Sequence, residues 1–333
     1  MAINLQKLKS KKSIQELLEF GIINIDKPSG PTSFNVSDFV RKTLGLRKTS
    51  HFGTLDPKVT GVLPIALNRA CKLTGYFIGE DKEYVGIMRI HDDVSLDKIK
   101  KMIKEKFMGV IKQTPPVKSR VKRQEREREI IKFKLLEKDR RDILFHVECQ
   151  GGTYIRKLVD DLGKELGIGA HMLELRRVRA GIFEENDTLK DTSKDYPSVN
   201  LYDFEKAVEK YKEGDDKLLR EIIIPGEVIS KLHQVIKIKD DNLAKLLTGK
   251  PIHEDDLRSS AYTLKGTSPK LRNEGAKKSK IGVGEIVVVF CGERFVGMYK
   301  VIKDGNVYAK SEFVFQEIKL PTSSDARRRS HHA

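Results

Sequence analysis

Short apolar runs bounded by glycine, proline or charged residues predict the strands of the first part of the chain. The run from Val62 to Leu67 is continuous and rich in branched residues, which is typical of a buried strand. Strands are predicted at residues 21–25, 62–67, 82–90, 130–136 and 142–149. The last two are separated by a charged turn and are expected to pair with each other.

Apolar residues at helical spacing, together with capping residues, predict the helices. Thr32 or Ser33 can cap a helix that ends at Gly45, and Ser95 can cap an amphipathic helix that ends at Phe107. Thr153 is the predicted cap of a third helix, which stops at Gly167. Residues 1–19 form a lysine-rich amphipathic arm or a frayed terminus, and residues 184–228 are interpreted as a charged, helical connector.

Short strands dominate again beyond Pro225-Gly226, which marks a predicted boundary. They are predicted at residues 235–238, 284–290, 294–300 and 306–309. The predicted organisation is an arm at 1–20, a domain at 21–228, a smaller domain at 229–320 and a tail at 321–333.

Two segments have little apolar patterning and are predicted to be disordered. Residues 258–280 are rich in lysine and arginine, and we expect a basic insertion that contacts a polyanionic partner. Residues 321–333 are polar and form either a natural basic tail or a remnant of recombinant expression.

The charge of the chain indicates a polyanionic partner. Lys and Arg number 64 against 48 Asp and Glu in 333 residues, which gives a net charge of +16 and an isoelectric point near 9.5. Nucleic acid is the simplest partner for such a protein. A protein that binds a membrane surface, or a thermophilic protein with a highly charged surface, could have the same net charge. Charge alone therefore does not distinguish these two alternatives from a nucleic-acid-binding protein.

Cysteine usage and hydropathy predict a soluble, cytoplasmic protein without a membrane segment. Cys71, Cys149 and Cys291 are odd in number and far apart, which excludes an internal disulfide framework and a CxxC zinc site. Residues 1–20 lack the apolar core of a signal peptide, and no stretch of about 18 apolar residues occurs.

Asp56 is the first candidate for chemistry. It lies between Gly53 and Gly61 in the stretch SHFGTLDPKVTGVLPIAL. Pro57 has a fixed φ and restricts Asp56 to extended backbone, so the carboxylate is held on a rigid turn ahead of a buried strand. Aspartate before proline also occurs in ordinary turns for local reasons.

The motif HxGTLDPxxxGVLP resembles the catalytic motif of the TruB/dyskerin family of pseudouridine synthases, in which this aspartate is essential. Further resemblances are GIINIDKPSGPTS, the KxY motif at 82–84, GTYIRKL and the block at 169–183, so the similarity covers most of residues 21–183. It implies an enzyme that flips uridine out of RNA, breaks its N-glycosidic bond and joins C5 to the ribose, with no cofactor and no metal.

The resemblance implies that Asp56, Arg156 and Tyr84 are catalytic. Arg156 would pair with Asp56 and keep it ionised, and Tyr84 would stack on the target base. From the residues alone, Arg156 could instead pair with Asp160 on the same helix, and Tyr84 could be an ordinary strand aromatic.

Four residues are expected at the substrate by resemblance: His51, Tyr154, Leu175 and Lys27. His51 would position the flipped nucleotide, Tyr154 would contact the active site, and Leu175 would pack beneath the target base. Lys27 belongs to a lysine-proline pair that supports the catalytic loop in the family.

The charged stretch QTPPVKSRVKRQERERE occupies the place of the family's thumb loop over the RNA. The resemblance favours a mobile clamp on phosphates, whereas composition alone would allow a solvated loop. The expected clamp residues are Lys118, Arg120, Lys122 and Arg123, followed in the same stretch by Arg126 and Arg128.

The implied fold is the α+β pseudouridine-synthase fold, a mixed, mostly antiparallel sheet flanked by helices, with which the strand and helix predictions are compatible. The segments LLTGKPI and VGEIVVVFCGERFVGMYKV resemble the PUA domain, so a PUA-like β-barrel that binds RNA is expected at the C-terminal side.

The motifs GTLDPKVTGVLPIAL and TPPVKSRVKR look closer to the archaeal and eukaryotic dyskerin branch than to bacterial tRNA enzymes. That branch implies the catalytic subunit of an H/ACA ribonucleoprotein, in which a guide RNA selects uridines in rRNA. The implied protein partners are a short zinc-binding or linear protein, a small β-barrel protein and a kink-turn-binding protein. The compact chain favours an archaeal source.

Two alternatives remain open from the sequence. One is a guide-independent tRNA pseudouridine synthase. The other is a non-catalytic RNA-binding scaffold, against which the presence of Asp56, Tyr84 and Arg156 argues.

Overall fold

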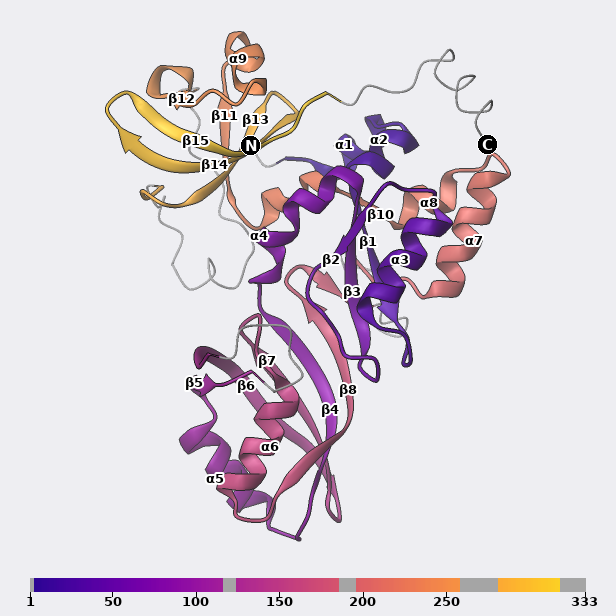
Figure 1. Ribbon diagram of the computed structural model, residues 1–333, viewed down its shortest axis with the longest axis vertical. Helices are drawn as coiled ribbons and strands as arrows, with labels where there is room; N and C mark the ends of the chain where they lie inside the picture. Colours follow the sequence, from indigo (N-terminus) through magenta and orange to yellow (C-terminus); the bar gives the residue numbers. More distant parts are fainter. Residues whose placement is uncertain (1–2, 116–123, 186–195, 258–280, 318–333) are drawn as a thin grey trace. The chain divides into compact units, whose positions relative to one another are not determined.

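The computed structural model describes residues 3–115, 124–185, 196–257 and 281–317, which fall into two compact units (Figure 1). The larger unit comprises Ile22–Ile223, and the smaller one combines Met1–Gly21 with Ile224–Ala333. The segment predicted as an N-terminal arm is helical and belongs to the same unit as the C-terminal residues.

A mixed sheet forms the larger unit. Its strands are β1 (Gly21–Lys27), β2 (Thr49–His51), β3 (Thr60–Leu67), β4 (Lys82–Ile90), β5 (Gly109–Gln113), β6 (Arg126–Asp139), β7 (Asp142–Cys149), β8 (Ala170–Ala180) and β9 (Phe183–Glu184). They run in the order β1-β3-β8-β4-β7-β6-β5, with β2 on β3 and β9 on β8. Only the β3–β8 pair is parallel among these described pairs. The predicted α+β class with a mostly antiparallel sheet is confirmed.

Helices connect and cover these strands. They are α3 (Ser33–Thr43), η1 (Asn68–Leu73), α4 (Thr74–Ile78), α5 (Leu96–Lys106), α6 (Ile155–Glu165), α7 (Leu201–Lys212) and α8 (Lys217–Ile222). Thr32 caps α3 and Ser95 caps α5 through their side-chain oxygens, as the sequence predicts.

The start of α6 differs from the prediction. Its cap residue is Tyr154 and not Thr153, whose hydroxyl donates to the carbonyl of Gln150 at 2.7 Å and so belongs to the preceding turn. The apolar spacing of α6 is as expected, because Leu158, Val159 and Leu162 are fully buried. The helix therefore begins one residue later, which places Arg156 at its second position.

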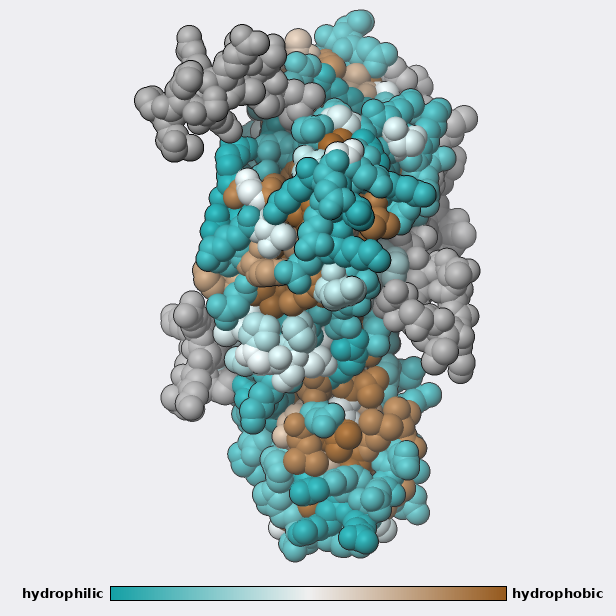
Figure 2. Space-filling view, turned by 90° about the vertical axis from the view of Figure 1, so that its right-hand side faces the viewer, coloured by the Kyte–Doolittle hydropathy of each residue, from teal (hydrophilic) through white to brown (hydrophobic). Residues whose placement is uncertain are grey.

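Helices α5 and α6 lie against one face of the sheet around β4, β6, β7 and β8 (Figure 1). The other face carries half-buried Val85, Ile87 and Leu144, with the exposed Leu136 and Leu173 at bulges of β6 and β8. Figure 2 shows a broad apolar surface on this lower part of the molecule. This part of the sheet therefore presents apolar surface among charged neighbours.

The smaller unit contains a second sheet. Its elements are α1 (Leu5–Lys11), α2 (Ile14–Glu19), η2 (Gly226–Lys231), β11 (Gln234–Ile238), η3 (Asp240–Asn242), α9 (Leu243–Leu247), β12 (Ile252–His253), η4 (Glu254–Asp256), β13 (Ile286–Cys291), β14 (Arg294–Asp304) and β15 (Val307–Val314), and the chain enters it through β10 (Ile223–Pro225). The sheet order is β11-β13-β14-β15-β12. Its core includes Ile236, Val287, Val296 and Tyr299. This arrangement is consistent with the expected PUA-like barrel.

Phe20 fixes the N-terminal helices to this second sheet. Its ring stacks on Phe295 with 5.2 Å between centroids, and its carbonyl accepts a hydrogen bond from the Gly226 amide. In the described residues, no helix is both long and apolar enough to cross a membrane.

Gly163 lets α6 approach β8, and its replacement provides a test of this packing. A Cβ at Gly163 would lie 2.1 Å from the backbone nitrogen of Ala170, so Gly163→Ala must separate the helix from the strand. We expect a loss of about 3 kcal/mol in the free energy of unfolding, measured by urea denaturation.

Gly75→Ala is the matched control, because a Cβ at this position in α4 meets nothing within 4 Å. Alanine favours a helix over glycine by about 1 kcal/mol, so this variant should be neutral or slightly stabilised. Equal stability of the two variants would show that α6 and β8 adapt to the added methyl group.

Candidate active site

Asp56 and Arg156 form an ion pair in the larger unit. Asp56 lies in the loop between β2 and β3, and Arg156 extends from the first turn of α6. The Nη2 atom of Arg156 is 2.8 Å from Oδ2 of Asp56, and both side chains are about half exposed. Asp160, the other candidate partner, pairs with Lys164 instead. The guanidinium therefore orients the carboxylate at the surface, where a substrate can reach it.

A buried lysine holds the turn that carries Asp56. The Nζ atom of Lys27 donates to the carbonyls of Pro28, Pro57 and Val59 at 2.8, 2.9 and 2.8 Å. Burial lowers the pKa of Lys27, and the negative charge of Asp56 opposes this shift. Three carbonyl acceptors match the three N–H donors of an ammonium group, so the protonated side chain links β1 to both sides of the turn.

Lys27 was expected to contact the substrate, and the geometry of its side chain changes this prediction. Its side chain has no exposed surface, and backbone carbonyls occupy its three N–H donors. Lys27 therefore supports the loop, which is the function its lysine-proline pair has by resemblance, and does not reach a substrate.

The start of α3 holds the same loop from a second side. Buried Ser33 Oγ accepts from the Leu55 amide at 2.7 Å and donates to the Leu55 carbonyl at 2.9 Å. The Gly30 amide donates to the Pro57 carbonyl at 3.0 Å. The residues on both sides of Asp56 are thus fixed by hydrogen bonds, which limits the positions available to the carboxylate.

Tyr84 faces the site from β4, opposite Arg177 of β8. Tyr84 is 8% exposed, and the guanidinium of Arg177, 1% exposed, hydrogen-bonds its hydroxyl. Arg177 also donates to the carbonyls of Val62 and Gly53 at 2.7 and 3.2 Å. Burial raises the pKa of Tyr84 and lowers that of Arg177. The phenol therefore stays neutral and is held by a buried cation.

Lys82 lies beside this arginine, behind the loop that carries Asp56. A Cβ added to Gly53, which has φ +98°, would lie 3.4 Å from Nη1 of Arg177 and 3.9 Å from Cε of Lys82. Burial, reinforced by the charge of Arg177, lowers the pKa of Lys82 to about 7. Its amine donates to the carbonyls of Ile78 and Glu80 at the end of α4. Two buried basic groups thus lie beneath the backbone that leads to Asp56.

His51 lies near Arg177, and Leu175 lies two residues before Arg177 on β8. Burial and the charge of Arg177 lower the pKa of His51, so its imidazole is neutral near pH 7. Within the described residues, the buried Nδ1 atom of His51 has no hydrogen-bond partner. Leu175 is buried on β8 on the same face as Arg177. A neutral imidazole and an apolar side chain are suited to contact a base.

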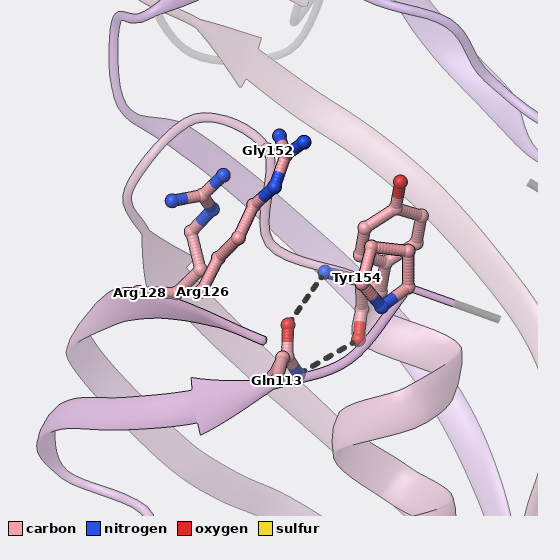
Figure 3. Close-up of a pocket in the computed structure, with 6 residues that line it drawn as sticks. Gln113, Arg126, Arg128, Gly152 and Tyr154 are labelled. Carbon is pink, nitrogen blue, oxygen red and sulfur yellow. Dashed lines mark hydrogen bonds between the residues drawn. The ribbon is translucent and has the colours of Figure 1, made fainter. Parts of the chain in front are cut away.

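Tyr154 is fixed by its backbone at the beginning of α6. Its amide donates to Oε1 of Gln113 at 3.0 Å, and its carbonyl accepts from Nε2 of Gln113 at 3.2 Å (Figure 3). This pair joins the end of β5 to the first turn of α6 and hence to Arg156. The predicted clamp residues Lys118, Arg120, Lys122 and Arg123 lie outside the described residues.

Four residues that hold the site were not predicted from the sequence to do so: Arg177, Lys82, Ser33 and Gln113. A signal for Arg177 was present, because two successive arginines in a strand must point to opposite faces. Arg176 pairs with Asp26 and Glu185 on one face, whereas Arg177 enters the core. No comparable sequence pattern marks Ser33 or Gln113, since both act through backbone groups distant in the chain.

The arrangement combines an accessible carboxylate with aromatic and apolar side chains of the same unit. The carboxylate of Asp56 can act as a nucleophile or a base, and Arg156 stabilises its charge. Tyr84 lies within electrostatic range of Asp56, and His51 and Leu175 lie near Arg177. This combination is suited to chemistry on a nucleotide extruded from an RNA strand.

Comparisons with known proteins agree with this geometry. Residues 41–155 match the family model of the TruB family pseudouridylate synthase N-terminal domain, and residues 156–230 match that of the tRNA pseudouridylate synthase B C-terminal domain. The probable tRNA pseudouridine synthase B of Methanocaldococcus jannaschii is 42% identical over 280 residues, which are 84% of this chain and 75% of the relative. That of Pyrococcus abyssi is 43% identical over 240 residues, 72% of this chain and 69% of the relative.

Solved structures show the same fold. A crystal structure of a Cbf5-Nop10-Gar1 complex contains a chain with a TM-score of 0.77 and 34% identity, over 92% of this chain and 88% of that chain. A structure of an H/ACA RNP bound to a substrate RNA containing 2′-deoxyuridine contains a chain with a TM-score of 0.76 and 33% identity, over 93% of this chain and 89% of that chain.

The fold and these matches define a pseudouridine synthase, an enzyme that isomerises uridine within RNA. The chain belongs to the TruB family of these enzymes, and its larger unit has the pseudouridine-synthase fold.

Replacing Arg156 by methionine tests whether the ion pair orients the carboxylate. We expect Arg156→Met to lower the rate of pseudouridine formation by about 100-fold, because a small displacement of a reacting group has an effect of that size. Thermal stability should change little, because ion pairs this exposed contribute at most about 1 kcal/mol. Asp160→Asn, on the same helix, is the control and should keep the wild-type rate. A normal rate for Arg156→Met would show that other groups hold Asp56.

Lys82 should make stability depend on pH. Its pKa is about 7 in the folded protein and about 10.4 in an unfolded chain. Between these values the unfolded chain binds more protons, so the free energy of unfolding rises with pH. Relative to Lys82→Met, the wild type should gain up to about 1.4 kcal/mol per pH unit between pH 7 and pH 9, measured by urea denaturation. A difference that does not vary with pH would mean that buried Lys82 keeps its proton.

Proposed function

We propose that this enzyme is the catalytic subunit of a guide-RNA ribonucleoprotein and that its substrate is uridine in rRNA. The observation that carries the proposal is the similarity to Cbf5 in complexes with Nop10 and Gar1, which extends over 92% of this chain and includes the smaller unit. In this proposal the guide RNA selects the uridine by base pairing, and the protein supplies the site and binds RNA with its net positive charge.

In the proposed reaction, Asp56 is the reactive carboxylate and Arg156 keeps it oriented. Tyr84 holds the flipped base with Leu175, and His51 and Tyr154 contact the nucleotide. The reaction is an isomerisation in which every substrate atom is retained, so no co-substrate is consumed. The ion pair between Arg156 and Asp56 supports these roles.

We also infer small protein partners of the kinds found in H/ACA complexes: a short zinc-binding or linear protein, a β-barrel protein and a kink-turn-binding protein. The apolar surface around Val85, Ile87 and Leu144, with exposed Leu136 and Leu173, supports a protein contact, because soluble monomers rarely expose large apolar patches (Figure 2). The smaller unit is proposed to be a PUA-like RNA-binding domain, and the source to be archaeal.

A guide-independent tRNA pseudouridine synthase is the second candidate. It is favoured by the curated relatives, which are named probable tRNA pseudouridine synthase B. The two candidates share the same chemistry and differ in what selects the uridine.

The two candidates predict different dependence on added RNA and proteins. Purified enzyme is incubated with a tRNA transcript or with an rRNA fragment, each with and without a matching H/ACA guide and the partner proteins, and pseudouridine is measured. We expect rRNA modification only when guide and partners are present. Efficient modification of tRNA by the enzyme alone would replace the first candidate by the second. Asp56→Ala is the control, which should abolish turnover and leave RNA affinity nearly unchanged.

A further inference from the structure

Phe34 is an exposed phenylalanine close to the candidate active site, and no function has been assigned to it. The chain contains 14 phenylalanines, all of them in the part that the structure describes, and Phe34 is the only one that is exposed. It is 70% exposed, whereas the others are buried or half-buried. Single exposed apolar side chains are common on protein surfaces, so the position of Phe34 decides what its ring can contact.

The backbone holds Phe34 close to Asp56. Phe34 follows Ser33, whose hydroxyl is hydrogen-bonded to the amide and the carbonyl of Leu55 at 2.7 and 2.9 Å, and Leu55 precedes Asp56. Helix α3 also packs on β2 and β3, the strands on either side of the loop that carries Asp56. Because consecutive Cα atoms are about 3.8 Å apart, the Cα atoms of Phe34 and Asp56 are separated by at most about 14 Å. A nucleotide that flanks the one at Asp56 is therefore within reach of the ring.

The first turn of α3 holds the backbone of Phe34 in place. Oγ1 of Thr32 accepts from the Asn35 amide at 3.0 Å, and Oδ1 of Asn35 accepts from the Thr32 amide at 3.1 Å. This reciprocal cap fixes the chain on both sides of Phe34. The buried stripe of the helix does not include Phe34 and consists of Ser33, Val36, Ser37 and Val40. An aromatic ring on a fixed backbone offers a large contact area at a low cost in conformational entropy.

The charges around Phe34 and Asp56 allow a polyanion to approach. Residues 28–35 and 57–60 contain no acidic residue, and Lys58 among them is exposed. Asp56 itself is paired with Arg156. An RNA strand can therefore pass from Asp56 to Phe34 without meeting an uncompensated carboxylate in these segments.

The chemistry of the ring matches a base and not a phosphate. When a nucleotide is flipped out of an RNA strand, the bases on either side of it lose a stacking partner. Phenylalanine has an aromatic face and no polar side-chain atom, so it can stack on any base but cannot bind a phosphate or read a base edge. Phe34 is thus suited to cover a base that the flipped uridine has left unstacked.

We propose that Phe34 stacks on the base of a nucleotide that flanks the target uridine in the substrate RNA, and that it replaces the stacking which this base loses when the uridine is flipped. The inference rests on the proposed function in one respect, which is that the ligand is the substrate RNA, and it holds whether or not a guide RNA selects the uridine. Stacking of this kind positions the strand and adds little sequence preference.

The first experiment measures pseudouridine formation by Phe34→Ala, Phe34→Leu and Phe34→Tyr in the mixture of RNA and proteins that gives turnover with the wild type. For Phe34→Ala and Phe34→Leu, the KM for the RNA should rise about tenfold, as for the loss of one stack between a base and an aromatic ring. The kcat should stay near the wild-type value. Phe34→Tyr keeps an aromatic face and should keep the wild-type KM. A wild-type KM for Phe34→Leu would overturn the proposal, because an apolar side chain without an aromatic face would then suffice.

Tyr202→Ala is the matched control. Tyr202 is 73% exposed and, like Phe34, is the second residue of a helix in the larger unit. This variant should keep the wild-type KM. An equal rise for Tyr202→Ala and Phe34→Ala would overturn the proposal, because the effect would then not depend on the place of the ring beside Asp56. Thermal denaturation of all variants confirms that each is folded.

The second experiment removes the base instead of the ring. Substrate RNAs carry an abasic nucleotide on the 5′ or on the 3′ side of the target uridine. One of the two should raise the KM about tenfold for the wild type and have no further effect on Phe34→Ala, because the two changes remove the same contact. If both RNAs affect the two proteins alike, Phe34 does not stack on a flanking base. Loss of a partner protein from Phe34→Ala in the absence of RNA, together with that result, would assign the ring to a protein contact.

A fluorescent base separates this inference from the proposed function. 2-Aminopurine at the same flanking position loses fluorescence when it stacks on an aromatic ring, and this measurement needs no turnover. We expect the loss when the RNA binds the wild type and not when it binds Phe34→Ala, and equal fluorescence with both would overturn the stacking. The proposed function fails separately, if the wild type binds these RNAs but forms no pseudouridine under any of the conditions above.

Discussion

The position of Asp56 depends on one buried ammonium group. Lys27 contributes its three N–H donors to the carbonyls of Pro28, Pro57 and Val59, and these bonds compensate for the removal of its charge from water. The attraction of Asp56 contributes to the same balance. These hydrogen bonds link β1 to the turn. The loop that carries Asp56 therefore cannot move without exposing the Lys27 ammonium group to water or breaking its hydrogen bonds. The carboxylate is therefore positioned by the interior of the sheet, although it lies at the surface itself.

The site forms where the parallel pair of strands β3 and β8 adjoins the antiparallel part of the larger sheet. Strands β3 and β8 approach so closely at Gly61 that a Cβ there would lie 2.2 Å from the Arg177 carbonyl. On its other side, β8 pairs with β4 and sets Arg177 against Tyr84. One strand thus brings the loop of Asp56 and the ring of Tyr84 to the same place. A side chain at residue 61 would separate them.

Short-range patterns in the sequence predicted many of the local features of the fold. The Thr32 and Ser95 caps, the buried strand after Asp56 and the apolar stripe of α6 follow from short-range rules. The Thr153 cap was wrong because its hydroxyl binds a carbonyl of the preceding turn. Contacts between residues that are distant in the chain could not be derived from sequence patterns. The pairing of Arg156 with Asp56 was expected only from a family resemblance. Lys27 binds backbone carbonyls, which leave no signal in the pattern of side chains. The roles assigned to the site residues remain predictions.

The exposure of the ion pair between Arg156 and Asp56 affects how strongly its two charges interact. In the free protein, 61% of the Arg156 side chain and 46% of the Asp56 side chain face water, which screens their attraction. A bound RNA strand would cover both groups and displace that water, so the same two charges would interact more strongly in the complex. The substrate would then complete the low-dielectric environment around this ion pair.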